Sequence, residues 1–270
     1  MRIETKRLSR LATLGGVMAA AFLTSCDTQP VDPLERGRAE LRRMSDTLTN
    51  SASFTFSTTE EHVRPGRGSE PVARNVSRQI AIRRPDGVWF SATGDRDGQV
   101  WYNGSTVTLV SRREEVWGRV ELPETLDEAL DELSIRYAVP MPMADLLYSS
   151  PYEAFWTDDT TGGWVGSEEI DGRGCHHLAF QHEAVDWELW VAEDEPALPC
   201  RLSIAYKQEP GETRSAITFS DWNLGVDLQD SRFEAEIPDG YERIGLVERL
   251  TPEELAELED AAAGEHKEQD

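Results

Sequence analysis

Apolar residues recur along the chain with two different periods, and each period predicts one kind of secondary structure. A helical period covers residues 32–48 and 124–133, where leucines share one face and charged residues the other. Asp32-Pro33 provides the first of these helices with an N-cap and a first-turn proline. Shorter helical turns are predicted at residues 143–148 and 151–156. The chain is therefore expected to begin with a helix and to carry a helical insertion near its middle.

A two-residue period of apolar and polar positions predicts strands in most of the remaining chain. The strands are expected around residues 54–56, 76–82, 88–90, 100–102, 107–110, 116–120, 164–170, 175–180, 187–191, 200–206 and 215–222. Asn103-Gly104 separates two of these strands and is a strong signal for a tight hairpin. This order predicts two runs of antiparallel strands, with the central helices covering one face of a sheet or one mouth of a barrel.

The N-terminal residues are typical of a bacterial export signal. Four basic residues between Arg2 and Arg10 precede an apolar stretch at residues 11–23. This stretch of about 13 residues is shorter than the roughly 20 that a transmembrane helix needs. It ends in Leu23-Thr24-Ser25-Cys26, which resembles the lipobox of bacterial lipoproteins. The resemblance implies that Cys26 is acylated and anchors the protein to a membrane. An ordinary signal peptide that ends near a cysteine is the alternative.

The expected segments are a signal peptide at 1–25, a tether at 26–33, a single domain at 34–245, and an acidic helix and tail at 246–270. No repeat or linker divides the central segment. Asp27 resembles an inner-membrane retention signal of enteric lipoproteins, but the choice between inner and outer membrane stays open. The predicted location is thus the periplasmic face of the cell envelope.

The chain is strongly acidic, with a formal net charge of −24 at pH 7. Removal of residues 1–25 takes away a net charge of +3 and leaves about −27. A surface of this charge repels the phosphates of nucleic acids, so a nucleic-acid partner is excluded.

Two cysteines, Cys175 and Cys200, remain after Cys26, and an oxidising envelope permits a disulfide. Cys175 begins one predicted strand and Cys200 begins the next but one. In a simple meander their Cα atoms lie about 9.6 Å apart, whereas a disulfide requires less than about 7 Å. The spacing therefore argues against a bridge, unless a bulge or a different strand order brings the cysteines together.

Several short segments resemble the DUF2092 family of predicted periplasmic proteins. They include Cys175-His176-His177-Leu178-Ala179-Phe180 and the segments 83–86, 100–104, 125–131, 144–148, 185–190 and 220–223. They occur in the expected order across residues 32–240. Cys200, where a basic residue is expected, and the acidic helix after Thr251 depart from the family pattern. The family looks like a relative of LolA, LolB and RseB. The resemblance implies an α+β fold with a strongly curved antiparallel β-sheet, a half-open barrel whose helices cover the concave face.

Motifs for catalysis or metal binding are scarce. The sequence has no nucleophile elbow, phosphate-binding loop or zinc-protease motif. His176 and His177 point to opposite faces of one predicted strand, and His182 lies about 20 Å further along a straight strand. A weak metal site near the turn at His182 and Asp186 is the alternative to an ordinary polar strand end. No cofactor, metal or enzymatic activity is therefore predicted.

Tryptophans are the most informative candidates for a binding site, because most of them lie on predicted strands. A curved sheet creates a concavity, and apolar side chains there could hold an acyl chain or a similar ligand. The candidate lining residues are Trp89, Trp101, Trp117, Met143, Leu147 and Trp187. Trp187 and Trp190, three positions apart, are expected on opposite faces of their strand. The alternative is that most of these side chains only pack the core.

Two hypotheses follow. The first is a non-enzymatic, membrane-anchored carrier of a hydrophobic ligand, such as a lipid or the acyl chain of another lipoprotein. The second is a protein-interaction or envelope-stress-sensing module that resembles RseB. The identity of the ligand, the partner and the oligomeric state are left open by the sequence.

Overall fold

The computed structural model describes residues 32–66, 70–137, 139, 141–208 and 213–248. The predicted signal peptide, Cys26, most of the tether and the helix expected after Thr251 lie outside the described residues. Within the described ranges, no helix is both long enough and apolar enough to cross a membrane.

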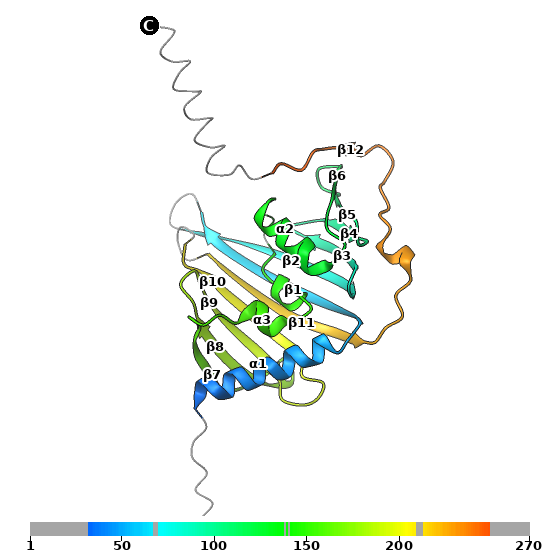
Figure 1. Cartoon of the computed structure of the whole chain (residues 1–270). Coiled ribbons are helices and arrows are strands. Elements are labelled where there is room, and N and C mark those ends of the chain that lie inside the picture. Colours follow the sequence, from blue (N-terminus) through cyan, green and yellow to red (C-terminus); the bar gives the residue numbers. More distant parts are fainter. Residues whose placement is uncertain (1–31, 67–69, 138, 140, 209–212, 249–270) are drawn as a thin grey trace, which may run out of the picture. The chain divides into compact units, whose positions relative to one another are not determined.

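The strands form one sheet that consists of two antiparallel meanders (Figure 1). The first contains β1 (Ser53–Pro65), β2 (Pro71–Arg83), β3 (Gly87–Gly94), β4 (Gly98–Tyr102), β5 (Thr106–Ser111) and β6 (Val116–Glu121). The second contains β7 (Thr161–Ile170), β8 (Arg173–Gln181), β9 (Val185–Ala192), β10 (Pro199–Tyr206) and β11 (Arg214–Leu224). Antiparallel pairing of β1 with β11 joins the meanders. A short strand, β12 (Glu242–Arg243), pairs in parallel with β6 and extends that edge of the sheet.

The position of the helices between β6 and β7 follows from the strand order. The first meander ends in β6, next to one edge of the sheet, and the second begins in β7 at the opposite edge. The intervening chain must therefore cross the sheet. It contains α2 (Leu126–Ile135), the 3-10 helix η1 (Ala144–Leu146) and α3 (Pro151–Phe155). We call these three elements the plug. The helix predicted at 143–148 is thus only a single 3-10 turn.

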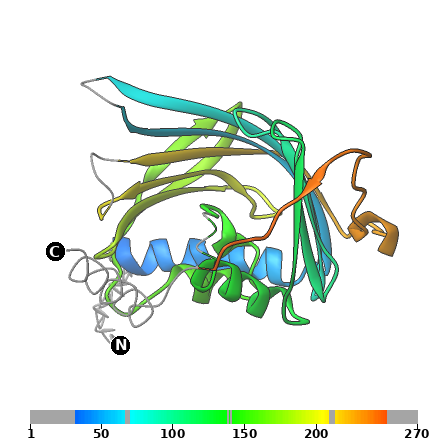
Figure 2. The ribbon, with the colours of Figure 1, turned by 90° about the horizontal axis from the view of Figure 1, so that it is seen from above.

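The predicted fold class is confirmed. Figure 2 shows the sheet curving around the plug and α1 (Pro33–Thr49), which lie together on its concave side. Side chains from all these elements form one core, including Leu41 of α1, Leu130 of α2, Leu146 of η1 and Phe54 of β1. Burial of this apolar surface stabilises the curved sheet. Apart from the helix expected at 143–148, the predicted helices and strands within the described residues are present, although β1 and β2 extend well beyond the ranges expected for them.

A smaller core covers part of the convex face. The chain after β11 forms a 3-10 helix, η2 (Asp230–Phe233), which places Phe233 against Trp89 and Trp101. Gly87 allows this contact, because a Cβ atom there would lie 2.8 Å from the Phe233 ring. Neither η2 nor β12 is apparent in the hydrophobic pattern, because both depend on contacts with distant strands.

The first helix rests closely on the edge strand β7. Asp32 caps α1 by accepting a hydrogen bond of 3.0 Å from the Leu34 backbone N–H. One turn later, Gly37 faces Gly163 of β7, and a Cβ atom at Gly37 would lie 2.8 Å from the Gly163 backbone. The pair of glycines therefore sets the close approach of α1 to the sheet.

Cys175 and Cys200 form a disulfide, which corrects the sequence-based argument against one. Their Cα atoms are 6.9 Å apart, although β9 lies between their strands. The register of β9 against β10 shifts between Pro199 and Arg201, so that Cys200 occupies a bulge. The bulge and the curvature of the sheet shorten the distance that a flat meander would impose.

Candidate functional site

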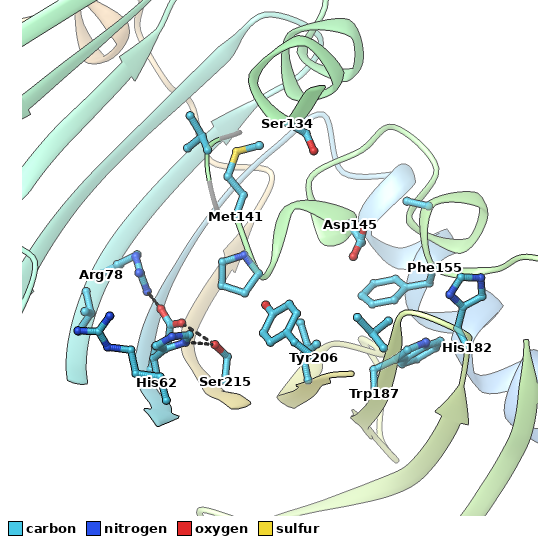
Figure 3. Close-up of a pocket in the computed structure, with 18 of the residues that line it drawn as sticks. His62, Arg78, Ser134, Met141, Asp145, Phe155, His182, Trp187, Tyr206 and Ser215 are labelled. Carbon is cyan, nitrogen blue, oxygen red and sulfur yellow. Dashed lines mark hydrogen bonds and ion pairs between the residues drawn. The ribbon is translucent and has the colours of Figure 1, made fainter. Parts of the chain in front are cut away.

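A cavity of about 650 Å³ opens between the concave face of the sheet and the plug (Figure 3). Its floor is formed by residues of β1, β2, β9, β10 and β11. Its roof is formed by α2, the segment around Met141, η1 and α3. The volume falls within the range of roughly 300–1,000 Å³ that is typical of ligand pockets.

The cavity floor changes from basic to apolar along one row of paired residues. Arg74 of β2 pairs with His62 of β1, which pairs with Ser215 of β11. Ser215 in turn pairs with Ile204 of β10, and Ile204 pairs with Trp187 of β9. All five residues line the cavity. Because directly paired residues project to the same face of a sheet, strand register alone creates this gradient, and we call these residues the cross-strand row.

The apolar end of the row lies beneath the plug. The Trp187 ring is 4.4 Å from the Phe180 ring and 4.9 Å from the Phe155 ring, measured between centroids. Phe155 belongs to α3, so the aromatic contact connects the plug to the floor. Figure 3 shows Trp187 and Phe155 side by side, with Met141 across the cavity. This end is suited to an aliphatic chain.

The polar part of the floor contains a hydrogen-bonded charge network. Arg78 Nη1 lies 2.6 Å from Glu60 Oε2, and both side chains are nearly buried. The Ser215 hydroxyl donates to Glu60 Oε1 over 3.1 Å. His62 Nδ1 lies 2.8 Å from the same hydroxyl oxygen. Glu60 thus neutralises Arg78 and orients Ser215, so Arg78 is already occupied within the protein.

Three further arginines line the same side of the cavity: Arg64 of β1, Arg74 of β2 and Arg96 of the β3–β4 turn. We call them the basic rim. Together with Arg78, they place four guanidinium groups on a cavity whose lining contains two carboxylates, Glu60 and Asp145. The local charge is thus opposite in sign to that of the whole chain.

Asp145 of η1 faces the cavity from the plug. Burial raises the pKa of Asp145 from 3.8 to about 6, because its carboxylate is removed from water. On its other side, Asp145 borders a second cavity of about 340 Å³, which is also lined by Asp127, Asp131 and Glu153. In the described part of the chain, no group of three or more His, Cys, Asp or Glu side chains is arranged to hold a metal ion.

Of the six lining residues predicted from the sequence, the structure brings only Trp187 to the cavity. Trp89, Trp101 and Trp117 lie on the convex face, which corrects their predicted placement. Trp89 and Trp101 pair directly with each other, and the C-terminal segment covers them. Arg232 of η2 stacks over the Trp89 ring at 3.6 Å from its centroid. The positions of the tryptophans in the sequence could not reveal which of them face the cavity, because the alternating pattern does not say which face of a two-sided sheet is concave.

Met143 and Leu147 flank η1 of the plug and pack into the core rather than line the cavity. Met141 and Phe155, which lie nearby in the sequence, line it instead. Trp187 and Trp190 do lie on opposite faces, as expected. Trp187 faces the cavity, and Trp190 stacks on His177 beside the disulfide.

The basic rim was not predicted, although the sequence contains a signal for it. Arg74 and Arg78 have the same parity along β2 as the apolar residues Val76, Ile80 and Ile82. In a strand, residues two apart share a face, so the pattern already placed two arginines on the apolar side. Only the structure shows that these two arginines line a cavity.

Several solved structures have a similar course of the chain. The Mycobacterium tuberculosis lipoprotein LppX matches at 16% identity with a TM-score of 0.45, over 71% of this chain and 97% of that chain. A LolA superfamily protein from Nitrosomonas europaea matches at 11% identity with a TM-score of 0.39, over 74% of this chain and 98% of that chain. The Pseudomonas aeruginosa MucA/MucB complex contains a match at 15% identity with a TM-score of 0.40, over 74% of this chain and 61% of that chain. These likenesses are too distant to assign a function.

No curated protein matches the chain. The family comparison is more informative, because one family model matches residues 38–247. The matched range contains every strand of the sheet, the plug and all the residues that line the cavity. Over this range, the chain therefore belongs to the DUF2092 family, which is described as predicted periplasmic proteins.

Proposed function

We propose that the protein is a non-enzymatic, periplasmic carrier that binds a hydrophobic ligand in the cavity between the sheet and the plug. The observation that carries the proposal is the 650 Å³ cavity itself, with an aromatic and aliphatic end formed by Trp187, Phe155 and Ile204. Each methylene group that leaves water for such a surface contributes about 0.8 kcal/mol. A long acyl chain would therefore gain most of its binding free energy at this end.

We expect the ligand to enter the cavity by displacing the plug. The roof is built from a 3-10 turn and two short helices, and it packs on the floor through apolar side chains such as Phe155 against Trp187. Apolar packing is not directional. When the roof moves away from the floor, contacts with the ligand replace the apolar contacts between roof and floor. A carrier needs such an exchange in order to load and release its cargo.

Acylation of Cys26 completes the proposal. Two or three acyl chains would hold the protein on the membrane far more firmly than one, and the folded domain would follow a short tether. The cavity would then collect its ligand at the membrane surface, either a lipid or the acyl chain of another lipoprotein.

Native mass spectrometry tests the proposed function. The chain from residue 26 onward, with Cys26→Ser, is exported behind a cleavable secretory signal and purified without detergent. Native spectra are then recorded before and after extraction with organic solvent. We expect an additional mass that extraction removes and that fragments as a lipid.

A matched pair of variants locates the ligand. Val185→Glu places a charge on the apolar wall of the cavity, whereas Val165→Glu places it on an exposed position of β7. We expect the first variant to lose the bound mass and the second to retain it. A chain without bound mass, also after incubation with envelope lipids, would reject the carrier function. The alternative, a protein-interaction or stress-sensing module, would then be tested by a search for a protein partner.

A further inference from the structure

The basic rim differs from the other arginines of the protein. Ion pairs, hydrogen bonds or aromatic rings engage the remaining arginines whose surroundings are described, for example Arg43, Arg136 and Arg232. Within the described ranges, Arg64, Arg74 and Arg96 have no such partner, and all three line the cavity. A chain with 51 acidic residues has carboxylates in excess, so three unpaired guanidinium groups around one cavity require an explanation.

Resting on the proposed function, we infer that the cavity takes a single-chain amphiphile with an anionic headgroup. The headgroup, a carboxylate or a phosphate, binds the basic rim. The alkyl chain follows the cross-strand row over β11 and β10 and ends beneath the plug, at Trp187.

The chemistry of the rim fits an anionic headgroup. Guanidinium groups donate two parallel hydrogen bonds to one carboxylate or phosphate, which adds geometry to charge. Arg64 and Arg96 are exposed and Arg74 is partly buried. The headgroup therefore keeps part of its hydration, which limits the desolvation penalty of a buried charge. Arg78 is neutralised by Glu60 and is not required for this contact.

The geometry of the row fits a long chain. Four strand spacings separate Arg74 from Trp187, which corresponds to roughly 19 Å along the row at about 4.8 Å for each spacing. The row begins with a cation, passes through His62 and Ser215, and ends with Ile204 and Trp187. An amphiphile has the same order of polarity from head to tail, whereas a wholly apolar ligand would leave the rim unused.

The overall negative charge of the protein determines how the basic rim would bind an anion. With a net charge of −24, the protein repels anions at long range. The rim must therefore act by direct contact, and binding should depend on these particular arginines rather than on the average field. Because Arg64 and Arg96 are exposed, added salt should weaken the headgroup contact.

Three ligands with one chain length test the inference: dodecanoate, dodecyl phosphate and dodecanol. Affinities are measured by isothermal titration calorimetry on the chain described for mass spectrometry, in the parent and in two variants. Arg64→Gln/Arg96→Gln changes the exposed part of the rim, where the fold is least affected. Arg214→Gln is the matched control, because Arg214 lies next to Ser215 on β11 but on the opposite face.

We expect both anionic ligands to bind more tightly than dodecanol. In Arg64→Gln/Arg96→Gln their affinity should fall about 10-fold or more, since a hydrogen bond to a charged group contributes about 1.5–3 kcal/mol. Dodecanol should be unaffected, and Arg214→Gln should bind all three ligands as the parent does. Arg74→Gln, with its fold checked by circular dichroism, should repeat the effect.

The outcomes separate the inference from the proposed function. If dodecanol binds as tightly as the anions, and the rim variants change nothing, the anionic headgroup is rejected while the hydrophobic carrier stands. If none of the three ligands binds, the single-chain anionic amphiphile is rejected, and the native mass spectra decide separately whether the carrier function stands. Tight binding of dodecyl phosphate without dodecanoate would support the inference and assign the headgroup to the phosphate class. The reverse preference would assign it to the carboxylates.

Discussion

Arg78 and Glu60 form a nearly buried ion pair at the polar side of the cavity, with a distance of 2.6 Å between Nη1 and Oε2. They lie on neighbouring strands, β2 and β1, and the pair is extended by Ser215 on β11. The network therefore bridges the junction at which the two meanders of the sheet meet.

This ion pair predicts an asymmetric response to substitution. Glu60→Ala should lower the free energy of unfolding by about 3–5 kcal/mol, because it leaves the Arg78 charge buried without its partner. The double substitution Glu60→Leu/Arg78→Met removes both charges and should recover most of the loss. Urea denaturation followed by circular dichroism measures both variants. A loss in the double variant that equals or exceeds that of Glu60→Ala would contradict the prediction.

The disulfide predicts a redox-dependent stability. Cys175 and Cys200 are 25 positions apart, and closure of a loop of this length should stabilise the fold by about 3 kcal/mol through the unfolded state. The midpoint of urea denaturation should therefore fall when a reductant is added. The Cys175→Ala/Cys200→Ala variant provides the control, since its midpoint should be low and insensitive to reductant. Equal midpoints for the oxidised and reduced parent would show that the bond adds no stability.

Asp145 predicts a stability that declines as the pH rises. Because burial raises the pKa of Asp145 in the folded state to about 6, above its value of 3.8 when exposed, the folded state favours the protonated carboxyl. This contribution is fully present below pH 3.8 and is lost between about pH 4 and 6. Asp145→Asn should remove the loss and raise the free energy of unfolding at pH 7 by about 1–3 kcal/mol.

The measurement for Asp145 is the difference between parent and variant from pH 3.5 to 7. All other carboxylates are the same in both proteins, so the difference isolates this one group. Asp127, Asp131 and Glu153, which share the second cavity with Asp145, are unchanged in both. A difference that stays constant with pH would contradict the raised pKa.

The close contact between Gly37 of α1 and Gly163 of β7 predicts that alanine at position 37 lowers the stability of the protein, although helix propensity alone would raise it. Alanine usually stabilises a helix interior by about 1 kcal/mol relative to glycine. Gly37→Ala should instead destabilise the protein by about 1–3 kcal/mol, since the new Cβ would lie 2.8 Å from the Gly163 backbone. Ala39→Gly, at an exposed position of the same helix, measures propensity alone. Thermal or urea denaturation of both variants decides which effect prevails, and a stabilised Gly37→Ala would show that the contact relaxes freely.

The proposed anchor predicts that Cys26 carries the acyl chains. Cells that produce the protein should incorporate labelled palmitate into it, and Cys26→Ser should abolish the label because the acceptor sulfur is gone. Cys175→Ala/Cys200→Ala, which leaves Cys26 intact, is the control and should remain labelled. Labelling of Cys26→Ser would place the lipid elsewhere or reject the lipoprotein assignment.

The secondary structure was largely predictable because it is encoded locally. The Asp32-Pro33 cap, the Asn103-Gly104 hairpin and the leucine face of α2 are each complete within one segment, and each prediction is confirmed. The family resemblance extended these elements to a curved sheet with helices inside it, which is also confirmed. The lipobox at Cys26 lies outside the described residues and stays a prediction.

The candidate site was much less predictable. Trp89 and Trp187 look alike in the sequence, since both lie on alternating strands, yet they occupy opposite faces of the sheet. The disulfide was missed because the bulge at Cys200 changes the register of a single residue. The basic rim was missed because an arginine on a strand is usually directed towards solvent.

By itself, the sequence determined which residues form most of the helices and strands and which positions of each strand share a face. These properties depend on neighbours a few positions away. The export signal that it indicates lies outside the described residues and stays a prediction. Only the tertiary structure decided which face is concave and which strands lie beside one another. The pairing of β1 with β11 joins residues more than 150 positions apart and places the rim and Trp187 in one cavity. Such a pairing is selected by the packing of the whole core around the plug, so no local pattern contains it.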